Sequence, residues 1–203
     1  GDVVNVQITK KRKNYCEGRV TQIVKESPDR LPAFCQHFCI CGGCKWQILP
    51  YEKQLFYKEK QAKDQLERIG HVTVSEYLPI LGSIDKEYYR NKLEFTFSNK
   101  RWITAEEAAT RAEITESNAL GFHVPRLFDK VVDIEHCHLQ GTPSNEIRNF
   151  IRTYALQHGL TFFDIRDHAG LLRNLIIRTS TNGECMVIVV FYEKDEKNIQ
   201  ELL

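Results

Sequence analysis

Four of the seven cysteines in this chain of 203 residues have the types of neighbour and the spacing expected of metal ligands. Cys35, Cys41 and Cys44 lie within the short segment CQHFCICGGC, and Cys137 follows far downstream. The two glycines before Cys44 are expected to allow a tight backbone turn with positive φ, so that both neighbouring sulfur atoms face one centre. Closely spaced thiolates completed by a distant cysteine suit a 4Fe-4S cluster, which takes four cysteine ligands.

Two other interpretations of the same cysteines stay open on the ligand pattern alone. A four-cysteine zinc site needs the same number of ligands, although such sites more often use two well-separated C-x-x-C pairs. The thiols could also hold no metal. Cys39 lies inside the segment and could replace Cys41 as a ligand or only fill space beside the site. Cys16 and Cys185 fall in strand-like patterns and are predicted to be small core residues.

The composition limits the class of protein. An odd number of cysteines argues against a secreted disulfide framework and fits a reducing compartment, which predicts a cytoplasmic protein. Hydrophobic residues make up 42% and charged residues 27% of the chain, as in ordinary soluble proteins. No segment approaches the length of an apolar membrane span. The net charge of +1 does not by itself indicate a nucleic-acid partner.

The first part of the chain predicts a hairpin and a helix. Residues 3–8 and 18–24 alternate like two paired strands, which are too few for an independent domain. Residues 25–32 are polar and contain two prolines, and they are expected to form a linker. A helix should begin at Pro50 and end before Gly70. Its expected buried stripe consists of Leu55, Leu66 and Ile69, extended by Ala62 or Tyr51.

The second part predicts strands with two flanking helices. Alternation is clear at residues 92–97 and weaker at 131–134, whereas residues 104–118 are expected to form a mobile, weakly helical insertion. A helix capped by Thr142 should run to near Gly159, with Ile147, Ile151 and Tyr154 facing the core. The last predicted elements are a hairpin of residues 171–178 and 184–192 around an Asn-Gly turn, and a helix from residue 194. Together these elements indicate an α+β fold with a mainly antiparallel sheet.

Several ordered segments of the chain match the motifs of one enzyme family. The segment CQHFCICGGCKWQ is followed by YRNKLEF, by GFH with a later VDI and CHL, and by LLRNLIIR. With these motifs the chain resembles the iron–sulfur-containing uracil-5-methyltransferases of 23S ribosomal RNA. The matching residues are 35–47, 89–95, 121–123, 132–134, 137–139 and 171–178.

The resemblance implies a cofactor and a domain arrangement. It implies that Cys35, Cys41, Cys44 and Cys137 bind a 4Fe-4S cluster. Members of this family have an OB-like N-terminal domain, a central cluster-bearing domain and a C-terminal domain that binds S-adenosylmethionine. By this resemblance residues 1–28 are the last strands of the OB-like domain, and residues 29–203 are the central domain.

The departures from the family concern catalysis. The family's nucleophilic cysteine lies in a Ser-Cys-Asn-Pro-like motif, and its S-adenosylmethionine site needs a glycine-rich loop. Neither motif occurs here, so no catalytic residue is assigned. The sequence therefore predicts a portion of an enzyme that is itself inactive, with S-adenosylmethionine bound only by the C-terminal domain that it lacks.

Basic side chains mark three places where RNA could bind. RNA affinity begins with phosphates meeting lysine and arginine. A basic hairpin tip and the polar start of a strand are the first two places, although a solvated turn and an ordinary strand entrance explain them equally well. A later strand supplies the third. The residues are Lys10, Lys11, Arg12, Lys13, Arg90, Asn91, Lys92 and Arg173.

We expect the partner to be 23S ribosomal RNA and the protein to be a monomer without membrane association. Two alternatives remain. One is the matching portion of a transfer-RNA uracil-5-methyltransferase, which would use the same chemistry. The other is a non-enzymatic RNA-binding adaptor with a zinc or iron–sulfur site.

Overall fold

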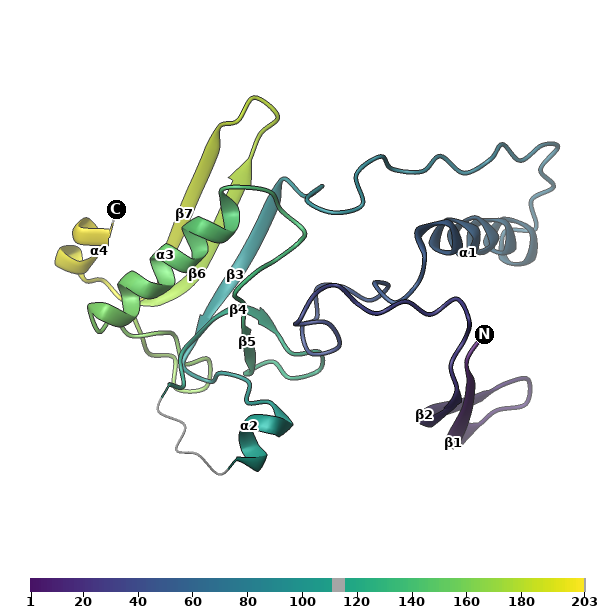
Figure 1. Ribbon diagram of the computed structural model, residues 1–203, viewed down its shortest axis with the longest axis horizontal. Helices are drawn as coiled ribbons and strands as arrows, with labels where there is room; N and C mark the ends of the chain where they lie inside the picture. The colour runs from purple at the N-terminus through teal and green to yellow at the C-terminus, as the bar shows by residue number, and fades with distance from the viewer. Residues whose placement is uncertain (111–115, 203) are drawn as a thin grey trace. The chain divides into compact units, whose positions relative to one another are not determined.

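The computed structural model describes residues 1–110 and 116–202, and these form two compact units (Figure 1). Unit 1 comprises Gly1–Phe34 and Trp46–Gly82, and unit 2 comprises Cys35–Lys45 and Ser83–Leu203. The expected cysteine segment therefore belongs to the second unit together with Cys137. The domain boundary expected after residue 28 stays a prediction.

Unit 1 contains the expected hairpin and the expected first helix. Strands β1 (Val3–Lys11) and β2 (Cys16–Lys25) pair in antiparallel fashion. Nearly all their side chains are exposed, including Cys16, so the prediction that Cys16 is a core residue is wrong. A two-stranded sheet has no second layer of its own to bury a face.

Helix α1 (Tyr51–Asp64) continues as the π-helical turn η1 (Gln65–Ile69), which confirms the predicted helix. None of its residues is fully buried, and Ile69 is 76% exposed. The expected buried stripe is therefore wrong, because unit 1, which consists of a two-stranded sheet, one helix and loops, contains no part of the hydrophobic core. Gly70 keeps a right-handed conformation, and the positive φ of 51° falls on His71. Ion pairs line the exposed surface, such as that between Lys60 and Asp64.

Unit 2 is built on an antiparallel five-stranded sheet in the order β5-β4-β3-β6-β7, which confirms the α+β fold. The outer strand β7 pairs with β6 through the predicted Asn-Gly hairpin, where Gly183 has a φ of 89°. Cys185 is exposed at the start of this edge strand, so its predicted place in the core is also wrong. The strands are β3 (Lys92–Ser98), β4 (Ala119–His123), β5 (Val131–Asp133), β6 (Leu172–Thr179) and β7 (Cys185–Phe191).

The hydrophobic core lies between this sheet and helix α3 (Ser144–Gln157), which runs along it in Figure 1. Alternate residues of β3, Leu93, Phe95 and Phe97, are buried on the face that the helix covers. The helix contributes its apolar stripe, as the spacing predicted. Ile151 is buried, and Ile147 and Tyr154 pack against the core.

Two short helices complete the described structure. Helix α2 (Ala105–Ala109) begins with a capping box between Thr104 and Glu107. The mobile insertion expected at residues 104–118 lies in part outside the described residues. Helix α4 (Glu196–Leu202) confirms the helix expected from residue 194. Within the described ranges, no helix has the length and apolar character needed to cross a membrane.

Candidate thiol centre

Two segments of unit 2 bring the four predicted ligand cysteines together. The loop from Cys35 to Cys44 is folded by turns, in which the amide of Phe38 donates to Cys35 O at 3.0 Å and that of Cys41 donates to the carbonyl of His37 at 2.8 Å. Cys137 is buried in the core, and Cys41 and Cys44 pack against the same core.

Two polar residues fix the loop against the segment before Cys137. Gln36 donates from Nε2 to the Glu135 carboxylate at 3.2 Å. The backbone amide of Glu135 donates to His37 Nε2 at 3.3 Å. Burial lowers the pKa of His37, which favours the neutral imidazole that can accept this bond. The loop is thus held where its thiols face Cys137.

Helix α3 supplies the support for Cys137. The Asn145 side chain binds both backbone groups of Cys137, accepting from its amide at 2.8 Å and donating to its carbonyl at 3.1 Å. Arg148 donates to Asn145 Oδ1 at 2.8 Å and to the carbonyl of Ile134 at 2.9 Å. The Arg148 side chain is fully buried, so a cation lies in the core beside the thiols.

The thiols influence one another's protonation. Burial, together with the nearby thiols of Cys137, Cys44 and Cys35, raises the pKa of Cys41 to about 11. Burial also raises the pKa of Cys137, while Arg148 acts in the opposite direction. Without a metal, the Cys41 and Cys137 thiols would therefore be protonated near neutral pH, and a metal would have to displace their protons.

The described thiols do not form a closed site for a single metal ion. Among the described residues, no three His, Cys, Asp or Glu side chains are arranged to hold a single metal ion. A structural zinc ion and a 4Fe-4S cluster can each take four cysteine ligands. The donor set of four mutually interacting thiols is compatible with such a cluster.

The glycines act differently from the expectation. Gly42 and Gly43 do not have positive φ, which occurs in this loop at Cys39, with a φ of 71°. Gly42 instead permits a close approach, because a Cβ there would lie 3.1 Å from the carbonyl oxygen of His123. The amide of Gly43 donates to Cys41 Sγ at 3.3 Å. Cys39 is exposed, whereas Cys41 is half-buried.

The predicted RNA-binding residues Arg90, Asn91 and Lys92 lie beside the segment that contains Cys137. The amide of Arg90 donates to the carbonyl of Leu139 at 2.8 Å, only two residues after Cys137. All three side chains are exposed. The structure therefore brings these candidates to the edge of the candidate centre.

The remaining predicted RNA-binding residues lie elsewhere. Lys10 and Lys11 end β1, and Arg12 and Lys13 follow in the turn of the unit 1 hairpin, all exposed. Arg173 is exposed in unit 2, where its guanidinium lies 5.1 Å from the ring centre of Phe163.

Sequence reasoning missed Asn145 and Arg148, although a signal for Arg148 was present. The buried stripe of α3 contains Ser144, Arg148, Ile151 and Ala155, at helical spacing. A charged residue at such a core position needs buried partners. Asn145 carries no comparable signal, because an asparagine in a first helical turn is ordinary.

No family model matches the chain, but curated proteins are similar to it in sequence. A protein of Bacteroides thetaiotaomicron named an uncharacterized RNA methyltransferase is 53% identical over 190 residues, covering 94% of this chain and 42% of the relative. One of the same name from Porphyromonas gingivalis is 51% identical over 210 residues, covering 100% of this chain and 45% of the relative.

A solved structure is also similar. The Pyrococcus abyssi tRNA (uracil-54, C5)-methyltransferase, in complex with S-adenosyl-L-homocysteine, has a TM-score of 0.61 and 25% identity, covering 98% of this chain and 40% of that one. The chain spans less than half the length of these relatives. It is thus similar, over nearly all of its length, to part of proteins named RNA methyltransferases.

Proposed function

We propose that this chain is the RNA-recognition and 4Fe-4S-binding portion of an S-adenosylmethionine-dependent 23S rRNA uracil-5-methyltransferase. The observation that carries the proposal is the meeting of Cys35, Cys41 and Cys44 with Cys137 in a chain about half identical to named RNA methyltransferases. The cysteine motif, with its resemblance to the iron–sulfur-containing family, supports the iron–sulfur assignment over zinc.

In this proposal the four cysteines hold the cluster, which supplies a cross-link between two distant segments of the chain. In the loop, Cys41 joins Cys35 and Cys44 as a ligand, because Cys41 packs against the core whereas Cys39 is exposed. Arg148 and Asn145 hold the Cys137 backbone in place. The exposed Arg90, Asn91 and Lys92 beside this segment would contact RNA, as would Lys10–Lys13 and Arg173.

The methyl-transfer chemistry is assigned to other parts of the full-length protein. We propose that residues 1–28 end an OB-like domain, that residues 29–203 form the central domain, and that a further domain binds S-adenosylmethionine. The full-length protein would be a cytoplasmic monomer. This chain alone would transfer no methyl group.

The cluster assignment is tested by comparing two cysteine variants prepared without oxygen. Cys41→Ser should lower the iron content, the melting temperature and the RNA affinity of the protein, because a ligand is lost. Cys39→Ser is the matched control, since Cys39 is exposed in the same loop, and it should behave as the wild type. Equal effects of the two variants would contradict the assignment.

A second candidate, a transfer-RNA uracil-5-methyltransferase, is favoured by the likeness to the Pyrococcus abyssi enzyme. Full-length protein should be incubated with methyl-labelled S-adenosylmethionine and either 23S rRNA or transfer-RNA transcripts. Our proposal predicts labelled uridine in 23S rRNA. Label only in transfer RNA would support the second candidate, and label in neither would favour a non-enzymatic RNA-binding adaptor.

A further inference from the structure

The rings of Tyr88, His136 and His138 form a cluster next to Cys137, and none of them belongs to the thiol centre. The hydroxyl oxygen of Tyr88 lies 3.1 Å from His136 Nε2 and 3.2 Å from His138 Nδ1. The two imidazole rings are 4.5 Å apart, and Glu87 lies 3.1 Å from His138 Nδ1. The Tyr88 ring is therefore held at its hydroxyl end by two imidazoles.

The backbone holds Tyr88 in an uncommon conformation. Its φ is 56°, in the left-handed region that a bulky residue rarely adopts. Two hydrogen bonds fix this geometry, because the amide of Tyr88 donates to His138 O at 2.8 Å and that of Arg90 donates to Leu139 O at 2.8 Å. Residues held in this way concentrate at binding sites and active sites.

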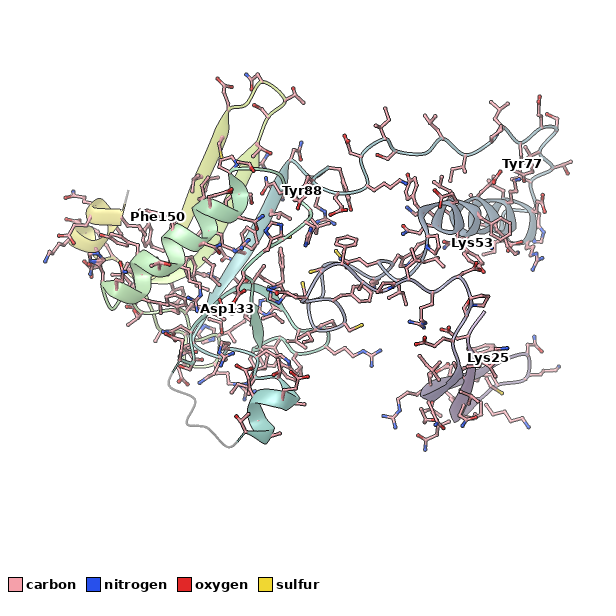
Figure 2. The ribbon with its side chains drawn as sticks, viewed as in Figure 1. Lys25, Lys53, Tyr77, Tyr88, Asp133 and Phe150 are labelled. Carbon is pink, nitrogen blue, oxygen red and sulfur yellow. The ribbon has the colours of Figure 1, made fainter. Side chains whose placement is uncertain are left out.

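The ring nevertheless remains open to a ligand. Tyr88 is 46% exposed although its hydroxyl already has partners, and His136 is exposed as well. Figure 2 marks Tyr88 close to the start of β3. A tyrosine that served only to cover the core would be buried, whereas this ring is fixed and accessible.

Positively charged side chains lie close to Tyr88 along the chain and across the sheet. Arg90 is exposed, and Lys92 is directly opposite Arg178 across strands β3 and β6. Like charges at such a cross-strand position are unfavourable. An anionic ligand would relieve this repulsion, and the phosphates of a nucleic acid strand are such ligands.

We propose that Tyr88, positioned by His136 and His138, is a stacking platform for an unpaired base of an RNA strand whose phosphates contact Arg90 and Lys92. Unstacked RNA bases bind to aromatic and histidine rings, and any base can stack because each has a π-face. This inference rests on the proposed function, since it names the form in which RNA meets this part of the chain.

The test measures binding of a fluorescein-labelled oligouridylate to the chain by anisotropy. Tyr88→Leu should weaken binding roughly fivefold to a hundredfold, the range found when a stacking side chain is removed. Tyr88→Phe keeps the ring and should bind more tightly than Tyr88→Leu. Phe150→Leu is the matched control, because Phe150 is a 67% exposed aromatic residue of the same unit, and it should bind as the wild type.

A second readout separates stacking from a change in folding. An oligonucleotide containing 2-aminopurine should lose fluorescence on binding to the wild type and keep it on binding to Tyr88→Leu. If the wild type binds RNA but Tyr88→Leu has unchanged affinity and quenching, the platform is refuted while the proposed function stands. If the wild type binds no RNA, both the platform and RNA recognition by this chain are refuted.

Discussion

Replacing Arg148 by methionine tests how helix α3 supports the cysteine segment. Methionine is long and unbranched, so it fills much of the space of the buried side chain while removing its donors. Two of the acceptors that lose a hydrogen bond from Arg148 keep another donor. The carbonyl of Glu135 still accepts from the Asn149 side chain, and Asn145 Oδ1 still accepts from the amide of Cys137. The carbonyl of Ile134, a residue 3% exposed, loses its donor.

The expected loss of stability follows from this one carbonyl. A buried polar group left without a partner costs about 1–3 kcal/mol, so we expect Arg148→Met to lower the free energy of unfolding by about 2 kcal/mol. For a unit of this size that corresponds to a decrease of about 6–10 °C in melting temperature. Arg152→Met is the control on the same helix, since Arg152 forms a half-buried ion pair with Asp133 and should contribute less than about 1 kcal/mol.

The assay is urea unfolding followed by tryptophan fluorescence. The chain has two tryptophans, of which Trp46 belongs to unit 1 and Trp102 packs against the core of unit 2. A Trp46→Phe background therefore reports on unit 2 alone. If Arg148→Met unfolds at the same urea concentration as its parent, or if Arg152→Met loses as much stability, the reasoning from the orphaned carbonyl is wrong.

Three further predictions concern the thiols, an acidic side chain and a glycine. Because the pKa of Cys41 is raised to about 11, metal binding must release its proton, so chelators should remove the metal more readily at about pH 6.5 than at pH 8.5. Hydrogen bonds, above all from Asn99, hold the pKa of Asp164 well below its usual range. The stability that this lowered pKa gives is present above pH 4 and should be lost as the pH falls below about 3.9. In acid unfolding curves, Asp164→Asn should therefore show a smaller loss of stability at low pH than the wild type. A Cβ at Gly121 would lie 2.0 Å from the carbonyl oxygen of Val132, so Gly121→Ala should destabilise the protein by at least about 1–3 kcal/mol. Gly141→Ala should not destabilise it, because the nearest atom to a Cβ at Gly141 is 3.9 Å away. Equal melting temperatures of the two variants would contradict this prediction.

The sequence predicts those elements whose signals are local. The alternation at residues 92–97 predicts strand β3, and the Asn-Gly turn before Cys185 predicts the hairpin of β6 and β7. Proline and glycine mark the ends of α3, and its apolar spacing correctly identifies Ile151 as a core residue. These features depend on a few neighbouring residues and require no knowledge of the packing partner.

Burial is harder to predict because it depends on residues that are distant in sequence. Leu66 and Ile69 have the spacing of a buried stripe, but unit 1 offers no layer that would cover them. Cys16 and Cys185 alternate correctly within strands, yet their strands have an uncovered face or edge. Arg148 is the opposite case, since its charge predicts exposure whereas the carbonyls before Cys137 hold it in the core.

The sequence predicts the cysteines of the candidate site but not the residues that support them. The structure brings Cys35, Cys41, Cys44 and Cys137 together, and their role as metal ligands stays a prediction. The ring cluster around Tyr88 depends on a backbone pairing between residues about fifty positions apart, with a hydrogen bond from Tyr88 to His138. No local pattern in the sequence encodes that pairing.

The most direct test of the central claim is the iron, acid-labile sulfide and zinc content of protein prepared without oxygen. We predict about four iron and four sulfide per chain, which is the content of a 4Fe-4S cluster with four cysteine ligands. About one zinc per chain without sulfide would contradict the account and would indicate a structural four-cysteine zinc site instead.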